Sequence, residues 1–121
     1  SLADATLLGV AGGDRAGATV AGLGGVMGEE YGPALGLGAP NQDDGAEDGG
    51  AVYIWWSTLS GTVSLADADA RLLGLHEGGF AGLGLAAGGD IDRNGRADVL
   101  IGAPGSNGGF GQAYIVGSFE L

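Results

Sequence analysis

The chain has 121 residues, a formal net charge of −11 and no cysteine, and 45% of it is hydrophobic. This acidity leaves no basic face for nucleic acid, the apolar content argues against disorder, and without cysteine neither disulfides nor thiolate metal sites form. The 29 glycines show no three-residue period, which excludes collagen, and no apolar run is long enough to insert into a membrane.

The chain repeats itself. We divide it into two units, residues 1–63 and 64–121, because short segments recur in the same order in both. The matched segments are 1–5 with 64–68, 7–9 with 72–74, 15–17 with 80–82, 38–40 with 102–104, and 50–54 with 111–115. No signal peptide is visible at Ser1, as expected of a chain that is mature, trimmed or excised from something longer.

Each unit contains four short segments with strand character, separated by glycine-rich turns, and helical periodicity is absent. The segments are 5–10, 16–23, 34–38 and 51–56 in the first unit, and 70–75, 81–87, 98–102 and 112–117 in the second. Four strands recurring at this period predict an all-β fold of two four-stranded antiparallel β-propeller blades.

One loop of the second unit has the spacing of a calcium site. Oxygen-bearing side chains recur at every second residue, a glycine allows a sharp bend, and a final carboxylate closes the loop. We predict that Ca²⁺ is bound by side-chain oxygens of Asp90, Asp92, Asn94 and Asp98 and by the main-chain carbonyl of Arg96. An EF-hand is excluded, because its twelfth position, which needs a bidentate Glu, is Ile101 here.

The calcium loop followed by a strand and by Gly102-Ala103-Pro104 resembles the FG-GAP repeat of integrin alpha-subunit β-propellers. The resemblance implies two tandem copies, each supplying about one blade, with the calcium loop between adjacent strands and away from the ligand face. The family's Phe-Gly pair is replaced by Ala16-Gly17 and Ala81-Gly82, which leaves the local packing open. In the first copy the calcium loop is degenerate, since Ala34 stands where Asp98 closes the second loop.

Two blades cover each other once and leave two outer faces open. We therefore expect completion by oligomerisation, most simply a homo-oligomer, or by adjacent blades of a longer propeller. The predicted function is a calcium-binding structural or adhesive scaffold without catalysis, because no nucleophile or acid–base constellation is visible. Calcium sites of this kind suit an extracellular or cell-surface location, where the ion is abundant.

Two features leave alternatives open. Trp55 and Trp56 close a strand and point to opposite sides; one is expected to pack in a core, and the other could contact a glycan or a protein in a lectin-like module. The acidic run between Asp43 and Asp48 is expected to be a solvated loop, with a second, weaker cation site as the alternative. His76, the only histidine, is expected to be structural.

Overall fold

The computed structural model describes residues 3–117, and within them the protein is all-β. Nine strands form two antiparallel sheets and one parallel pair, and two short 3-10 turns join them. The strands are β1 (Ala5–Leu8), β2 (Thr19–Gly24), β3 (Ala34–Ala39), β4 (Ala51–Trp55), β5 (Gly61–Ser64), β6 (Ala70–Leu73), β7 (Gly84–Ala87), β8 (Val99–Ala103) and β9 (Gln112–Val116); the 3-10 turns are η1 (Glu29–Tyr31) and η2 (Leu65–Asp67).

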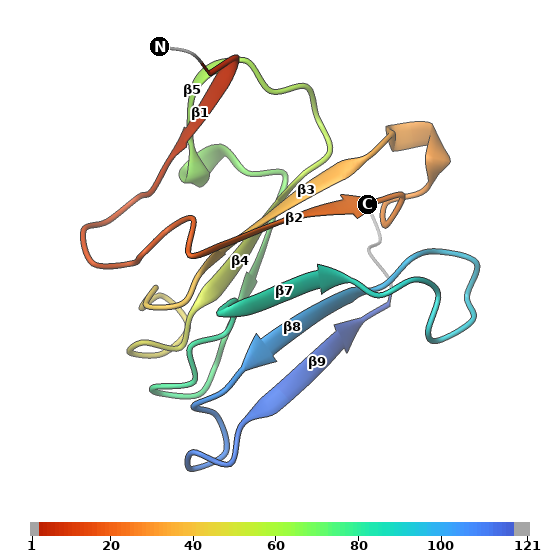
Figure 1. Ribbon diagram of the computed structural model, residues 1–121. Helices are drawn as coiled ribbons and strands as arrows, with labels where there is room; N and C mark the ends of the chain where they lie inside the picture. The colour runs from red at the N-terminus through yellow and green to blue at the C-terminus, as the bar shows by residue number, and fades with distance from the viewer. Residues whose placement is uncertain (1–2, 118–121) are drawn as a thin grey trace.

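The first sheet has the strand order β2-β3-β4-β6 and the second β7-β8-β9, all antiparallel (Figure 1). Strands β2 and β7, each at one edge of its sheet, lie side by side, and the two sheets face each other. The described residues form no closed ring of sheets.

The strand partners correct the sequence prediction in two places. The segment 70–73, assigned to the second unit, is the outer strand of the first sheet, where β6 pairs with β4. The second sheet accordingly has three strands among residues 3–117, not four. Strand propensity is a local property, whereas the choice of partner depends on how the chain crosses from one sheet to the next, so the repeat boundary and the sheet boundary differ.

The N-terminal segment is a further correction. β1 was expected to belong to the first blade, but it pairs in parallel with β5, a strand that the sequence pattern did not predict. Strands β2 and β7 also begin three residues later than expected. The reason is a turn in which Arg15 and Gly17, and likewise Phe80 and Gly82, adopt positive φ angles that a strand cannot accommodate.

The two sheets use equivalent main-chain hydrogen bonds. Gly17 N–H donates to the carbonyl of Gly38 at 3.0 Å, and Gly82 N–H donates to that of Gly102 at 3.1 Å. The turns after the Gly-Ala-Pro segments also match, since Gly50 N–H donates to Gln42 O at 3.0 Å and Gly111 N–H to Ser106 O at 2.9 Å. The repeat seen in the sequence is therefore also a repeat of backbone geometry, in which Gly38 corresponds to Gly102 and Gly50 to Gly111.

Two apolar clusters hold the fold together. One lies between the sheets and is built on the fully buried side chains of Leu23, Val52, Ile54 and Val99. The other lies on the opposite face of the first sheet, where Leu65 from η2 packs against Tyr53 and Trp55. The first sheet is thus covered on both faces, whereas the outer face of the second sheet exposes Ile115 at 55%.

Candidate metal centre

The loop between β7 and β8 is closed by two short main-chain hydrogen bonds. Gly88 N–H donates to Asp98 O at 2.8 Å, and Asp98 N–H donates to Gly89 O at 2.7 Å. Between these ends the chain turns sharply at Gly95, whose φ of 90° is a conformation that glycine adopts at no steric cost. The loop therefore returns on itself and brings its first and last residues together.

Asp98 is the buried centre of the loop, with 0% of its surface exposed. Its Oδ2 accepts hydrogen bonds from the N–H groups of Ile91, at 2.7 Å, and Asp92, at 3.0 Å. Its Oδ1 is buried and has no hydrogen-bond partner. A buried carboxylate oxygen without a partner is costly, because it has lost water and gained nothing in exchange.

Asp90 and Asp92 organise the exposed half of the loop. Asp90 accepts from Asn94 N–H at 2.9 Å through Oδ1 and from Gly95 N–H at 2.8 Å through Oδ2, and Asp92 Oδ1 accepts from Asn94 N–H at 3.2 Å. Partial desolvation and the charges of Asp98 and Asp90 raise the pKa of Asp92, against the lowering effect of the Asn94 N–H. The negative charges of Asp90, Asp92 and Asp98 therefore repel one another.

The three carboxylates converge. Asp90, Asp92 and Asp98 each offer one oxygen, and these oxygens all lie within 4.8 Å of one another. Calcium binds oxygen at about 2.3–2.6 Å, so two of its ligands can lie up to about 5 Å apart. This donor set of hard, negatively charged oxygens, with one oxygen buried and unpartnered, fits a divalent cation. Among the described side chains no other group of three acidic or histidine residues converges in this way.

Asn94 and Arg96 do not belong to the group of three converging carboxylates. Asn94 Oδ1 accepts the N–H of Arg96 at 2.9 Å, and Asn94 Nδ2 donates to the carbonyl of Gly117. An amide oxygen has a second lone pair, so Asn94 can still ligate. The ligand roles of Asn94 and of the Arg96 carbonyl remain predictions.

Gly117, just after β9, is part of the site although sequence reasoning did not select it. A Cβ at this position would meet Asp92 Oδ2 at 2.0 Å and Asp98 Oδ1 at 3.2 Å. Only a glycine therefore leaves room for the carboxylates beneath it. No local motif marks this residue, because it approaches the loop through the pairing of β9 with β8.

The corresponding loop of the first sheet, residues 25–33, is filled by apolar side chains. Val26 and Met27 are each 1% exposed, and Ala34 at the start of β3 is 4% exposed. The interior of this loop is therefore part of the apolar core between the sheets. The interior of the loop between β7 and β8 contains carboxylates instead.

The other residues singled out in the sequence lie away from this loop. Asp44 forms an ion pair with Arg71 at 2.5 Å, and Asp48 accepts from Asn41 at 3.1 Å, so the acidic run is tied into hydrogen bonds. Trp55 is 2% exposed and stacks on Tyr53, which confirms that one of the two tryptophans packs in a core. Trp56 is half-buried and packs edge-on against Tyr31.

A comparison with protein families matches residues 81–116 to the family model described as FG-GAP repeat. The match includes β7, β8, β9 and the whole acidic loop. It covers less than half of the chain. A comparison with curated proteins found no match. The FG-GAP repeat is an integrin-like β-propeller module that is generally structural, often binds Ca²⁺ and is typical of extracellular or surface proteins. Within residues 3–117 there is no helix of the length and apolarity that crossing a membrane requires.

Proposed function

We propose that the chain is a calcium-binding, integrin-like β-propeller repeat module that acts as a structural or adhesive scaffold without catalysis. Side-chain oxygens of Asp90, Asp92, Asn94 and Asp98 and the carbonyl of Arg96 bind the ion. The observation that carries the proposal is the buried, unpartnered Oδ1 of Asp98 beside the carboxylates of Asp90 and Asp92.

The physical reason is charge. Three carboxylates that converge within 4.8 Å repel one another, and the buried one cannot recover its lost hydration from water. A divalent cation offsets both costs, since it replaces water as the partner of Asp98 Oδ1 and cancels the repulsion from Asp90 and Asp92. The site should therefore favour Ca²⁺ over a monovalent ion.

The ion would also strengthen the second sheet. The loop joins β7 to β8, and Asn94 donates a hydrogen bond to Gly117, just after β9, so the site contacts or adjoins all three strands. A ligand that binds only the folded state stabilises it by about 2.7 kcal/mol at one hundred times its dissociation constant.

Thermal unfolding in excess Ca²⁺ and in chelator tests this proposal. We expect Ca²⁺ to raise the Tm of the parent chain by several degrees and to leave the Tm of Asp90→Ala unchanged. The control Asp67→Ala removes an exposed acid on η2, distant in sequence from the acidic loop, and its Tm should rise with Ca²⁺ as that of the parent does. Equal melting of the parent chain in Ca²⁺ and in chelator would remove the basis of the proposal.

The first sheet is proposed to be a second, degenerate FG-GAP copy, supported by the equivalent hydrogen bonds at Gly17 and Gly82. Two such copies are part of a larger ring, completed by further copies of the chain or by further blades. The module works outside the cell or on its surface, where Ca²⁺ is abundant.

Binding of a glycan or protein is the alternative function. Trp55 is buried and cannot contribute, but Trp56 and Tyr31 form an edge-to-face pair with 39% of Tyr31 exposed. Glycan-array binding that Trp56→Ala abolishes would support this alternative. Binding that Trp56→Ala leaves unchanged would exclude this pair.

A further inference from the structure

The asparagines Asn94 and Asn107 are each followed by a glycine. An asparagine in this position can react with its own backbone, because the nitrogen of the next residue attacks the side-chain carbonyl carbon. Glycine favours the attack, since it has no Cβ to hinder the approach. Both Asn-Gly pairs are exposed, so access to solvent does not distinguish them.

Hydrogen bonds at Asn94-Gly95 oppose this attack. Gly95 N–H donates to Asp90 Oδ2 at 2.8 Å. The Asn94 side chain accepts from Arg96 N–H at 2.9 Å and donates to the carbonyl of Gly117. The attacking nitrogen must lose its proton, and the carboxylate of Asp90 both binds that N–H and repels the negative charge that would form. The reaction therefore requires that these hydrogen bonds break first.

The pair Asn107-Gly108 has no such restraint. Within residues 3–117 neither the side chain of Asn107 nor the N–H of Gly108 makes a hydrogen bond. A Cβ on Gly108 would meet no atom within 4 Å, so the surroundings of its nitrogen are open. Residues 99–117 contain no Asp or Glu, so no carboxylate of this segment opposes a negative charge on the nitrogen.

Asn107 and Gly108 are the central residues of a tight turn between β8 and β9. Their φ angles are 56° and 66°, as in the type I′ turns that favour Asn-Gly. Two hydrogen bonds close the turn, Gly109 N–H to Ser106 O and Phe110 N–H to Asn107 O, and each is 3.3 Å long. Hydrogen bonds longer than usual between exposed residues open easily, which lets Gly108 N reach Asn107 Cγ.

We propose that Asn107 is a site of spontaneous modification by water, whereas Asn94 is protected by Asp90. Gly108 N forms a bond to Asn107 Cγ, and its proton leaves with the side-chain NH₂ group as ammonia, which closes a succinimide ring. Water then opens the ring. Attack at Cγ gives aspartate, and attack at the main-chain carbonyl gives isoaspartate. The net reaction consumes one water and releases one ammonia, without any oxidant or reductant.

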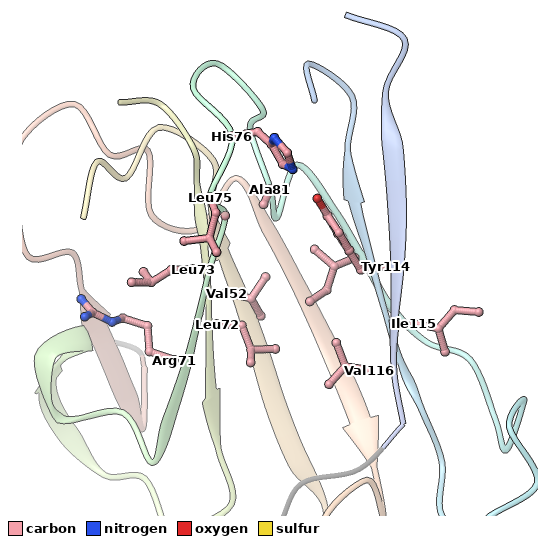
Figure 2. Close-up of a pocket in the computed structure, with 12 residues that line it drawn as sticks. Val52, Arg71, Leu72, Leu73, Leu75, His76, Ala81, Tyr114, Ile115 and Val116 are labelled. Carbon is pink, nitrogen blue, oxygen red and sulfur yellow. The ribbon is translucent and has the colours of Figure 1, made fainter. Parts of the chain in front are cut away.

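Isoaspartate at this turn would disturb β9, because it adds an atom to the main chain. The turn sets a register in which Ala103 lies opposite Gln112. In this register Tyr114 and Val116 point into the groove between β6 and β9, and Ile115 points to the opposite side of the strand (Figure 2). The modification therefore acts on the packing of β9 as well as on the charge of the turn.

Peptide mapping tests the difference between the two pairs. The full chain is incubated in chelator at neutral pH and digested with pepsin at low pH, and the peptides are weighed by mass spectrometry. We expect Asn107 to deamidate at least about tenfold faster than Asn94, because Asn94 must first lose hydrogen bonds to a charged group. In guanidinium chloride the two rates should become similar. Similar rates in the folded chain, or a faster reaction at Asn94, would overturn the proposal.

Asp90→Ala tests the protecting group, since it removes the acceptor of Gly95 N–H. Deamidation of Asn94 should rise toward its rate in denaturant, while that of Asn107 stays unchanged. The control Asp67→Ala, on η2, should leave both rates as in the parent. An Asn94 that stays as slow in Asp90→Ala as in the parent would contradict protection by Asp90. All samples contain chelator, so these results are independent of the calcium proposal, and the comparison within the parent chain does not require a folded variant.

Asn107→Gln tests the ring. Its longer side chain must close a larger ring, so release of ammonia from this turn should nearly stop. In the parent chain both isoaspartate and aspartate should appear at position 107, and aspartate alone would mean direct hydrolysis and would refute the succinimide. The isoaspartyl chain, separated by ion exchange, should melt below the parent. Equal melting would contradict the effect of the modification on β9.

Discussion

The main-chain N–H of Asp92 donates to Oδ2 of Asp98 at 3.0 Å, so the residue that closes the acidic loop also holds its middle in place. The two oxygens of Asp98 have different roles. Oδ2 is satisfied by the loop backbone, while Oδ1 is buried without a partner. The loop backbone is therefore held by hydrogen bonds within the protein, and Oδ1 is the oxygen that remains for a cation in the proposed site.

Asp98→Asn separates these two roles. The amide oxygen can still accept the N–H groups of Ile91 and Asp92, but its NH₂ group replaces a ligand oxygen and repels a cation. We expect stability in chelator within about 1 kcal/mol of the parent, together with complete loss of the calcium-induced rise in Tm.

Asp98→Ala is the contrasting variant, because it removes both oxygens. The N–H groups of Ile91 and Asp92, which make part-buried hydrogen bonds, then lose their acceptor, which costs about 2–4 kcal/mol even in chelator. Denaturant unfolding of the two variants measures the difference, and equal destabilisation would refute the division of roles.

Ala34→Asp introduces the closing carboxylate into the first loop. Ala34 is 4% exposed and lies among the apolar side chains of Val26 and Met27, and among the described side chains no cluster of acids like that around Asp98 lies beside it. We expect a loss of about 2–4 kcal/mol that Ca²⁺ does not restore. Calorimetric titration should give the same number of bound ions as the parent, and an additional ion would contradict this reading.

Gly38→Ala tests the close approach of the two sheets. Its Cβ would collide with the carbonyl of Gly82 and, at 2.3 Å, with Thr19 Oγ1, whose hydroxyl donates to that carbonyl at 2.6 Å. We expect a loss of about 2–4 kcal/mol in denaturant unfolding, against little change for Gly102→Ala. Similar losses of stability for both substitutions would show that the sheet faces at Gly38 and Gly102 are packed equally closely by other atoms.

The buried carboxyl of Asp14 predicts a pH dependence. Asp14 is 6% exposed, and burial, together with the charges of Asp43 and Asp44, raises its pKa. An acid whose pKa is raised by folding binds its proton more tightly in the folded state. Its charged form therefore destabilises the fold near neutral pH, and this penalty disappears as the pH falls below the ordinary value near 3.8.

Asp14→Asn should thus be more stable than the parent at pH 7 by up to about 1 kcal/mol, and no more stable at pH 3. Parallel melting curves across this range measure the effect. A gain that persists unchanged at pH 3 would show that charge is not its cause.

Much of the protein follows from local sequence. The alternation of Asp90, Asp92 and Asn94 before Gly95 predicted a loop whose acids converge, because ligand spacing in a tight turn is a short-range property. Eight of the nine described strands were also predicted within a few residues, β5 being the exception, and the Gly-Ala-Pro segments that recur in the sequence are followed by equivalent turns. These features depend on residues that are neighbours in the chain.

Only the tertiary structure decided which strands pair and which surfaces remain open. β1 and β6 share nearly the same sequence, yet one lies beside β5 and the other beside β4. Gly117 lies against the carboxylates of the acidic loop because of strand pairing between distant segments. For the same reason a Cβ on Gly38 would meet the other sheet, whereas a Cβ on Gly102 would not. Strand edges are chemically alike along their backbones, so their partners are selected by packing between distant segments, and no local pattern encodes that choice.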